Sequence, residues 1–295
     1  MISLSKVVKI INDPLRGRCV VASKPLSPGD VVLSTKAEAY VPSNNASRCA
    51  SCFTSSKPLR RCKGCSYAHY CSQACQKKDW KDGGHSKSCK YIQTLRSRLE
   101  NDSALSDTLL LIRIFCSESS IKSVSSMHFH TPSSDLERSS KRLIHTARSV
   151  VPLLSKFPRE VLLKTLYRFV SNNFAITDDL LLKVGAGVFP EGALFNHDCV
   201  PNCVVTYCGL VQNIRCTRHI REGEELTHSY VDVFATTSDR QSELYVLCCC
   251  VEALLTHTHT YTHINLKTPG SNTINSNATV QCVATALQTK KEING

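Results

Sequence analysis

Short apolar runs broken by Gly, Pro and Asn mark both ends of the structured part of the chain. In residues 15–33, the runs CVVA and VVL flank the turn segment SPGD at 27–30, and this pattern predicts two short strands. From 184 to 230, similar runs alternate with turn residues, which predicts small twisted strands. We expect a turn at Gly223 and a strand after it that ends at Val231.

Residues 93–171 instead carry the spacing of amphipathic helices. Mainly apolar side chains fall at helical spacing in two groups: Leu105, Leu109, Ile112 and Cys116, then Val161, Leu162, Thr165, Leu166 and Phe169. The Ser-rich segment 117–142 between the groups predicts a loop. Strands on either side of a helical stretch predict an α+β protein.

After about residue 235 the pattern decays. The run LLTHTHTYTHINLKTPGSNTINSNATVQ has no usable periodicity and few large apolar side chains, so we expect 236–295 to be a disordered tail. Its Thr-His alternation is what a translated AC-dinucleotide repeat would give, which raises the hypothesis of a retained intron or a faulty gene model.

Bulk composition narrows the classes of protein. The 295 residues are 42% hydrophobic and 20% charged, as in ordinary soluble globular proteins. The first ten residues lack the apolar core of a signal peptide, and no run of about 18 apolar residues is present, so we expect no membrane segment. The net charge of +12 favours acidic partners or nucleic acid. Because the basic residues are scattered along the chain, the sequence gives only weak support to nucleic-acid binding.

The 17 cysteines, in a chain without an export signal, indicate metal ligands rather than disulfides and a reducing compartment. Eight ligands fall in four pairs: Cys49 and Cys52, Cys62 and Cys65, Cys71 and Cys75, His85 and Cys89. They suffice for two closed tetrahedral zinc sites of structural type, because no position is left for water. Ordinary buried thiols are the alternative, which the regular pairing disfavours. The segment SQACQKKDW predicts a short helix that presents Gln76 and Trp80.

This cysteine pattern, with HYCSQACQKKDWKDGGHSKSC, resembles a MYND-type zinc finger. The resemblance implies interleaved coordination by two ligand sets: Cys49, Cys52, Cys71 and Cys75 on one ion, and Cys62, Cys65, His85 and Cys89 on the other. It also implies an interaction module for proline-rich peptides.

The stretch NHDCVPN, residues 196–202, places an amide, an imidazole and a thiol before a proline kink. It resembles the N-H-S-C-x-P-N signature of SET-domain lysine methyltransferases, and GEELTHSYVD at 223–232 resembles their G-E-E-L-T-x-x-Y segment. A SET core interrupted near its start by a MYND finger is the arrangement of the SMYD family. RGRCVVASKPLSPGDVV at 16–32 is similar to that family's first SET strands.

The resemblance implies five segments. They are an N-terminal part of the SET domain (1–45), the MYND finger (46–92), a helical insert (93–165), the SET catalytic core (166–235) and a degenerate post-SET region with a disordered tail (236–295). The expected fold is a SET β-sheet core of short strands with an inserted finger and a helical insert.

The implied activity is S-adenosylmethionine-dependent methylation of a lysine in a histone or another protein. A lysine amine is protonated at neutral pH, so the reaction depends on deprotonation and positioning of the amine. Tyr230 is the expected catalytic residue. The expected donor-binding residues are Gly17, Arg18, Cys19, Asn172, Ala193, Asn196, His197 and Tyr230.

For two of these residues a structural role is the alternative: a buried, hydrogen-bonded ring for His197 and a packing side chain for Tyr230. Asn172 comes from SNNFAI, which resembles C-N-S-F-T-I. Gly185 and Gly187 come from VGAGVFP, which resembles G-x-G-L-F/Y-P and allows close approach of the backbone. Pro201 is expected to shape a knot-like crossing of the chain.

Several positions depart from the family pattern. Cys19 stands at the second glycine of G-x-G, Asp198 replaces a serine and Ala193 occupies a position often held by serine. For the family's third zinc, Cys199, Cys248 and Cys250 offer three ligands, one short of a closed site. The helical repeat domain that follows in the family does not appear. The alternative function is therefore a catalytically inactive MYND-finger adaptor. We expect a monomer in the nucleus and cytoplasm.

Overall fold

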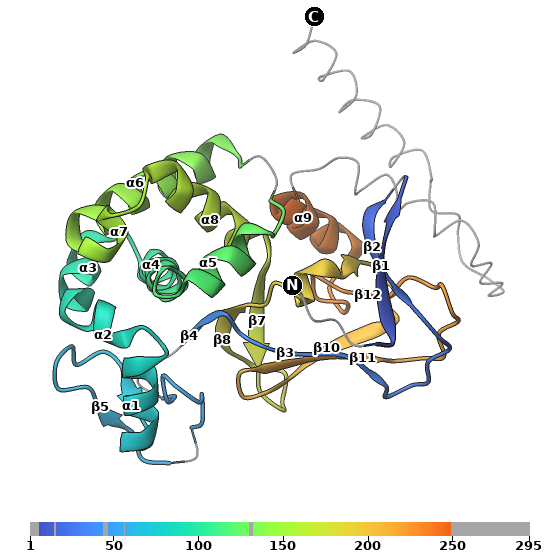
Figure 1. The fold of residues 1–295 in the computed structure, drawn as a ribbon, viewed down its shortest axis with the longest axis horizontal. Helices are drawn as coiled ribbons and strands as arrows, with labels where there is room; N and C mark the ends of the chain where they lie inside the picture. Colours follow the sequence, from blue (N-terminus) through green and yellow to red (C-terminus); the bar gives the residue numbers. More distant parts are fainter. Residues whose placement is uncertain (1–5, 15, 44–46, 56, 130–131, 249–295) are drawn as a thin grey trace, which may run out of the picture. The chain divides into compact units, whose positions relative to one another are not determined.

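The computed structural model describes residues 6–14, 16–43, 47–55, 57–129 and 132–248, without the side chains of 245–248. Within them, the chain alternates small sheets with a block of helices, as the expected α+β class requires (Figure 1). None of the helices described there has the length and apolar character needed to cross a membrane.

The strands form small, mostly antiparallel sheets. One hairpin pairs β1 (Val8–Asp13) with β2 (Gly17–Ala22). A second sheet has the order β10-β11-β3, from Cys203–Cys208, Val211–Cys216 and Val31–Lys36. A third has the order β4-β8-β7, from Ala39–Pro42, Lys183–Val188 and Asn173–Thr177. Two short strands, β9 (Asn196–His197) and β12 (Thr227–His228), run parallel to each other.

A block of helices lies in the sequence between residue 91 and β7. Its helices are α3 (Ile92–Arg98), α4 (Asp102–Phe115), α5 (Glu118–Ser125), α6 (Ser134–Val150), α7 (Pro152–Ser155) and α8 (Arg159–Ser171). The chain also contains two short 3-10 helices, η1 (Cys89–Tyr91) directly before α3 and η2 (Gly192–Leu194) directly before β9.

The prediction of a loop over 117–142 is wrong, because α5 and most of α6 lie within it. Its serines begin helices instead of breaking them. The Ser117 side chain accepts from the Ser120 N–H, and the Ser133 side chain accepts from the Leu136 N–H, which are N-caps of α5 and α6. Behind these caps, Val124 and Ile144 are fully buried and anchor the two helices.

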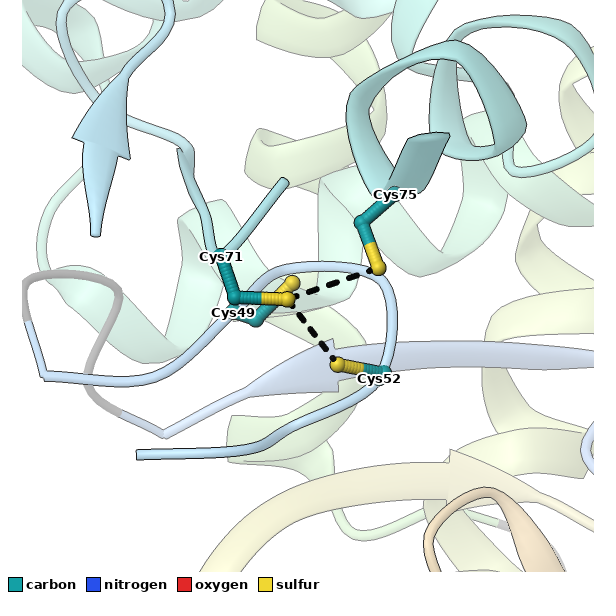
Figure 2. Close-up of side chains that lie close together, drawn as sticks. All are labelled: Cys49, Cys52, Cys71 and Cys75. Carbon is teal, nitrogen blue, oxygen red and sulfur yellow. Dashed lines mark hydrogen bonds between the residues drawn. The ribbon is translucent and has the colours of Figure 1, made fainter. Parts of the chain in front are cut away.

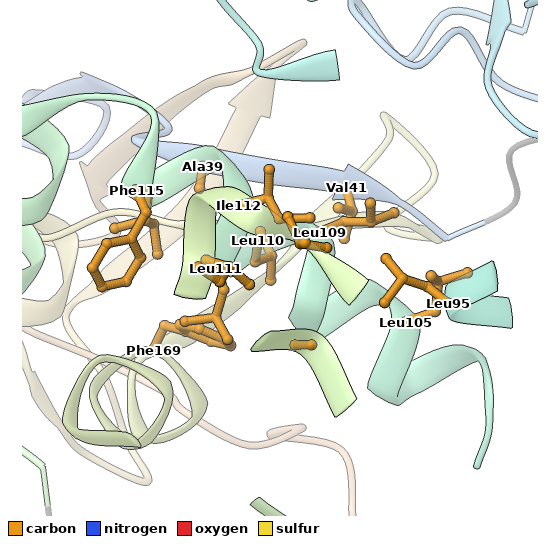
Figure 3. Close-up of a cluster of buried hydrophobic side chains, with 14 of the residues drawn as sticks. Ala39, Val41, Leu95, Leu105, Leu109, Leu110, Leu111, Ile112, Phe115 and Phe169 are labelled. Atoms are coloured by element: carbon orange, nitrogen blue, oxygen red, sulfur yellow. The ribbon is translucent and has the colours of Figure 1, made fainter. Parts of the chain in front are cut away.

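The helices pack around a large apolar core that α4 crosses (Figure 3). Its fully buried members include Leu110, Leu111, Ile112 and Phe169. The predicted helical spacing is confirmed for most positions, but Val161 is 39% exposed on α8 and Cys116 is exposed at the C-cap of α4. A second buried cluster joins side chains from β2, β3 and β11 to those of later loops, and it includes Val20, Val32, Phe195, Ile214 and Leu226.

The predicted strand from Gly223 to Val231 is reduced to β12. The chain there changes partners: Leu226 N donates to Val20 O of β2 at 2.8 Å, and the next residues pair with β9. Because two short pairings replace one long ladder, no continuous strand forms.

Order continues past the point where the pattern decays. Residues Thr237–Cys248 form helix α9, and Leu244 is buried, so the expectation of a disordered segment is wrong for this part. Residues 249–295, the rest of the predicted tail, lie outside the described residues.

Candidate metal centres and active site

The cysteine module folds as one short two-stranded hairpin and two short helices. Strands β5 (Arg60–Arg61) and β6 (His69–Tyr70) precede α1 (Gln73–Lys81) and α2 (His85–Ser88). The helix predicted over SQACQKKDW is confirmed as α1, begun by Ser72, whose side chain accepts from the Cys75 N–H at 3.1 Å. Trp80 is 47% exposed on it, and Gln76 is half-buried.

The eight predicted ligands gather into two groups whose ligand atoms all lie within 4.8 Å of one another. One group is Cys49, Cys52, Cys71 and Cys75 (Figure 2), and the other is Cys62, Cys65, His85 and Cys89. The grouping is interleaved along the chain, as the MYND resemblance implies.

The spacing of the sulfur atoms fits zinc. Sγ–Sγ distances are 3.6 Å for Cys52–Cys71 and for Cys71–Cys75, and 3.7 Å for Cys62–Cys89. Four thiolates at about 2.3 Å from a tetrahedral Zn²⁺ would be about 3.8 Å apart. Both groups therefore offer a complete donor set for a structural Zn²⁺.

The second group is the more enclosed, because all four of its residues are buried. Burial acts to raise the pKa of the Cys62 thiol, but the N–H groups of Cys65 and Gly64 and the neighbouring thiols outweigh it and lower that pKa. This favours the thiolate form that a metal ligand needs at Cys62, whereas burial raises the pKa of the Cys65 and Cys89 thiols.

An ion pair joins the finger to the helical block. Asp79 of α1 is fully buried and lies 2.8 Å from the Arg113 guanidinium of α4. The Tyr70 hydroxyl donates to the other Asp79 oxygen at 2.7 Å, and Arg113 lies 4.7 Å above the Tyr40 ring. Arg113 also donates to the Gly83 carbonyl, so charge and hydrogen bonds are satisfied together.

The candidate active site lies where three segments that are far apart in the sequence cross. Asn196 of β9 donates to the Arg18 carbonyl at 2.9 Å and to Glu225 Oε1 at 2.8 Å. Asn202 donates to the Glu225 carbonyl at 2.7 Å and accepts from the Thr227 N–H at 2.9 Å. The two asparagines of NHDCVPN thereby clamp the 196–202 segment to β2 and to the segment that leads into β12.

His197 and Tyr230 are coupled within this crossing. The buried His197 ring accepts from the Tyr230 N–H at Nδ1 (2.9 Å), so its Nε2 carries the hydrogen and faces Cys199 Sγ at 3.3 Å. The Tyr230 hydroxyl donates to the Phe195 carbonyl at 2.8 Å, and Tyr230 is 39% exposed. His197 thus has the buried, hydrogen-bonded position that was its alternative interpretation, and it fixes the backbone of Tyr230.

A cavity of about 250 Å³ opens beside Tyr230. Its lining includes predicted site residues Asn172, Ala193 and Tyr230, together with Phe174, Val205, Tyr207 and His228. None of the described residues that line it carries a charge at neutral pH. The Asn172 amide nitrogen is already bound to the carbonyls of His128 and Arg168, each at 2.7 Å, so it ties the cavity wall to the helical block.

The other predicted donor residues lie around the crossing. Gly17 has a φ of +71° and open space where a Cβ would stand, and Arg18 donates to the Ala193 carbonyl at 3.3 Å. The Cys19 thiol is buried against Asn196 Nδ2, 3.6 Å away, and burial raises its pKa to about 11. Cys19 therefore stays a neutral thiol packed within the protein.

Gly185 does permit a close approach, but to the protein's own chain. A Cβ at this position would lie 2.3 Å from the Phe53 ring and 2.6 Å from the Val41 carbonyl. Gly185 is the first glycine of VGAG, in the segment that resembles a family motif. Its lack of a side chain thus allows β8 to pack against the finger and β4.

Sequence reasoning missed His228, Phe174 and Tyr207 as cavity residues. Each stands on a different strand, β7, β10 or β12, and only the packing of these three strands brings them to one wall. His228 had one available signal, because it is an ionisable residue inside the motif segment GEELTHSYVD.

A SET domain family model matches residues 17–231. The chain belongs to the SET domain family. N-lysine methyltransferase SMYD2 from Homo sapiens is 32% identical over 257 residues, covering 81% of this chain and 58% of the relative. Histone-lysine N-methyltransferase SMYD3 from Mus musculus is 28% identical over 243 residues, covering 78% of this chain and 56% of the relative.

These matches and the two zinc groups place this SET protein in the SMYD family, as the motifs imply. The chain spans less than two thirds of the length of these relatives. A crystal structure of the SET domain of LSMT bound to MeLysine and AdoHcy is also similar, with 15% identity, a TM-score of 0.41 and coverage of 84% of this chain and 53% of that chain.

The third zinc set stays a prediction. Cys199 contacts His197, whereas the side chain of Cys248 and all of Cys250 lie outside the described part of the chain. Within that part, the two groups of the finger are the metal-ligand groups found.

Proposed function

We propose that this SET protein transfers a methyl group from S-adenosylmethionine to a lysine of a protein substrate. The observation that carries the proposal is the clamped crossing, because Asn196 and Asn202 bring β2, β9 and β12 together next to an uncharged cavity that contains Tyr230. The relatives named as N-lysine methyltransferases share this part of the chain.

The cavity suits an alkylamine nucleophile. Burial among uncharged side chains disfavours the ammonium form, so a lysine that enters loses its proton to water more readily than in solution. S-adenosylmethionine supplies the methyl group: the amine nitrogen forms the new N–C bond while the C–S bond breaks and its electron pair stays on sulfur.

Tyr230 would orient the amine. Its hydroxyl hydrogen is taken up by the Phe195 carbonyl, so the phenol oxygen presents lone pairs to an N–H group in the cavity. For the donor we propose Gly17, Arg18, Cys19, Asn196 and His197 at the crossing, together with Asn172 and Ala193 in the cavity lining. The open space at Gly17 leaves room for a ligand against the backbone.

Methyl transfer from isotope-labelled S-adenosylmethionine to a histone mixture and to a set of lysine peptides tests the proposal. We expect label on lysine, and a loss of about tenfold or more in kcat for Tyr230→Phe, the equivalent of one hydrogen bond of about 1.4 kcal/mol. Tyr91→Phe, on η1, serves as the matched control and should retain activity. Equal rates for wild type and Tyr230→Phe would remove Tyr230 from the reaction.

A second function is supported by the finger. We propose that it binds proline-rich peptides, because Trp80 exposes an aromatic surface next to a complete metal centre and packs edge-on against His85 at 5.9 Å. Trp80 is the single tryptophan of the chain, so its fluorescence reports on this surface. Saturable quenching by a proline-rich peptide is expected, with no quenching by the same peptide in which every proline is replaced by alanine.

Histones are proposed among the substrates, with action in nucleus and cytoplasm and a monomeric state. Direct nucleic-acid binding through the +12 charge would require an affinity that falls steeply with salt. Salt titration of binding to duplex DNA tests it.

A further inference from the structure

His228 belongs to β12 and lies two residues before Tyr230. It lines the 250 Å³ cavity and is only 3% exposed. Its ring centroid is 5.0 Å from the Tyr230 ring and 5.6 Å from the Phe174 ring. The imidazole is thus part of the aromatic wall beside the proposed catalytic tyrosine.

The hydrogen bonds of this ring define its tautomer. Nδ1 lies 3.0 Å from the Ser229 carbonyl. A carbonyl can only accept, so Nδ1 carries the hydrogen, and Nε2 of the neutral ring carries a lone pair. Nε2 is buried and has no hydrogen-bond partner among the described residues. A buried acceptor without a partner destabilises the protein, and such a group is usually completed by a ligand or a water molecule.

The surroundings restrict which ligand can complete it. The lining contains no carboxylate and no second metal-ligand side chain among the described residues, which argues against a metal ion at this position. An isolated acceptor in an uncharged, aromatic cavity is complementary to an N–H group carried on an apolar chain. The rings of Phe174, Tyr207 and Tyr230 add favourable contacts to a cationic head group.

We propose that Nε2 of His228 accepts a hydrogen bond from the amine of the target lysine and holds that amine beside Tyr230. This inference rests on the proposed lysine methyltransferase function and assigns a substrate-contacting role to a residue outside the predicted site set. Burial lowers the pKa of His228 to about 4. The ring is therefore neutral at physiological pH and acts as an acceptor, while the proton lost by the ammonium goes to water.

A direct test observes the imidazole nitrogens. Zinc-loaded full chain, labelled with ¹⁵N-histidine and saturated with S-adenosylhomocysteine, is titrated with n-butylammonium, which carries the lysine head group and methylenes. We expect the Nε2 resonance of His228, assigned by its absence in His228→Phe, to move upfield, because this nitrogen becomes a hydrogen-bond acceptor. Nδ1 should move less. n-Butyltrimethylammonium, which has no N–H, is the matched probe and should leave Nε2 unmoved.

Affinities give the second readout. The preference for n-butylammonium over n-butyltrimethylammonium should fall about tenfold in His228→Phe, which keeps the ring but loses the acceptor, and should be restored in His228→Gln, which returns one. An unshifted Nε2, equal shifts by both probes, or a preference unchanged in His228→Phe would overturn the proposal.

Failure of the proposed role of His228 can be distinguished from failure of the proposed methyltransferase function. Methyl transfer by wild type without an Nε2 shift refutes the role of His228 alone. An Nε2 shift without transfer to any lysine supports an alkylamine site and refutes the proposed enzyme function.

Discussion

The zinc finger and the cavity beside Tyr230 are both organised by polar side chains, but over very different distances along the chain. All ligands of the finger lie between Cys49 and Cys89, and the two members of each pair are only three or four positions apart in the sequence. The cavity collects walls from α8, β7, η2, β10 and β12, so its parts are far apart in sequence. Spacing can therefore predict the first site, whereas the second requires the whole fold.

The two regions also differ in what stabilises them. The finger depends on metal, because many of its buried core positions are cysteines. The crossing depends on buried hydrogen bonds from Asn196 and Asn202 to backbone groups. Removal of metal should thus damage one region first, and loss of an asparagine should damage the other.

The largest expected effect is loss of zinc. Chelation, or Cys62→Ala, should remove the finger's order, because zinc binding contributes about 10–16 kcal/mol in zinc-finger peptides. Hydrogen exchange should show unprotected amides in α1 while β2 and β11 stay protected. Cys208→Ala, at an exposed free cysteine, should keep both zinc ions. Protection of α1 that survives full metal loss would contradict this division.

The next largest effect on stability is expected from the ion pair between Asp79 of the finger and Arg113 of the helical block. Arg113→Ala leaves the buried Asp79 charge unpaired and should lower the free energy of unfolding by about 3–5 kcal/mol. Arg138→Ala, which removes an exposed pair with Asp135, should change it by less than about 0.5 kcal/mol. Urea unfolding of both variants measures this difference, and equal stability would show that the interface does not depend on the pair.

A pH effect of about 3 kcal/mol is expected from His228. Its pKa is about 4 in the folded protein and near 6.5 when unfolded, so between these values the unfolded chain binds a proton that the folded chain does not. The free energy of unfolding therefore falls as pH drops from about 6.5 to 4. His228→Phe should flatten this part of the curve, and an unchanged slope would place the effect elsewhere.

The smallest of these effects concerns Asn202. Asn202→Ala leaves the Thr227 N–H and the Glu225 carbonyl without their partner and should cost about 2 kcal/mol. Asn213→Ala on β11 is the control, since its backbone carbonyl, not its side chain, accepts the Thr206 hydroxyl. Thermal unfolding compares the two, and a loss in Asn213→Ala as large as that in Asn202→Ala would contradict the clamp.

Local patterns predicted much of this molecule. Helical spacing located α4 and α8, and ligand spacing with a family resemblance located both metal groups and their interleaving. The serines of 117–142 misled the prediction because the same residue types form loops and N-caps. Helix α9 carried too weak a pattern to be recognised.

Site residues were predictable in identity more than in role. The motifs pointed to Asn196 and His197, but only strand pairing and hydrogen bonds reveal a clamp and a coupling to Tyr230. No local pattern could indicate that Phe174, Tyr207 and His228 share a wall, because that depends on how three strands are placed.

The most direct test of the central claim is a calorimetric titration of S-adenosylmethionine into the zinc-loaded chain. If the clamped crossing builds a donor site, binding is saturable at one molecule per chain, persists in Asn213→Ala and is lost or strongly weakened in Asn196→Ala. Absence of binding to wild-type protein that is folded and carries both zinc ions would contradict the account and leave the finger as the functional part.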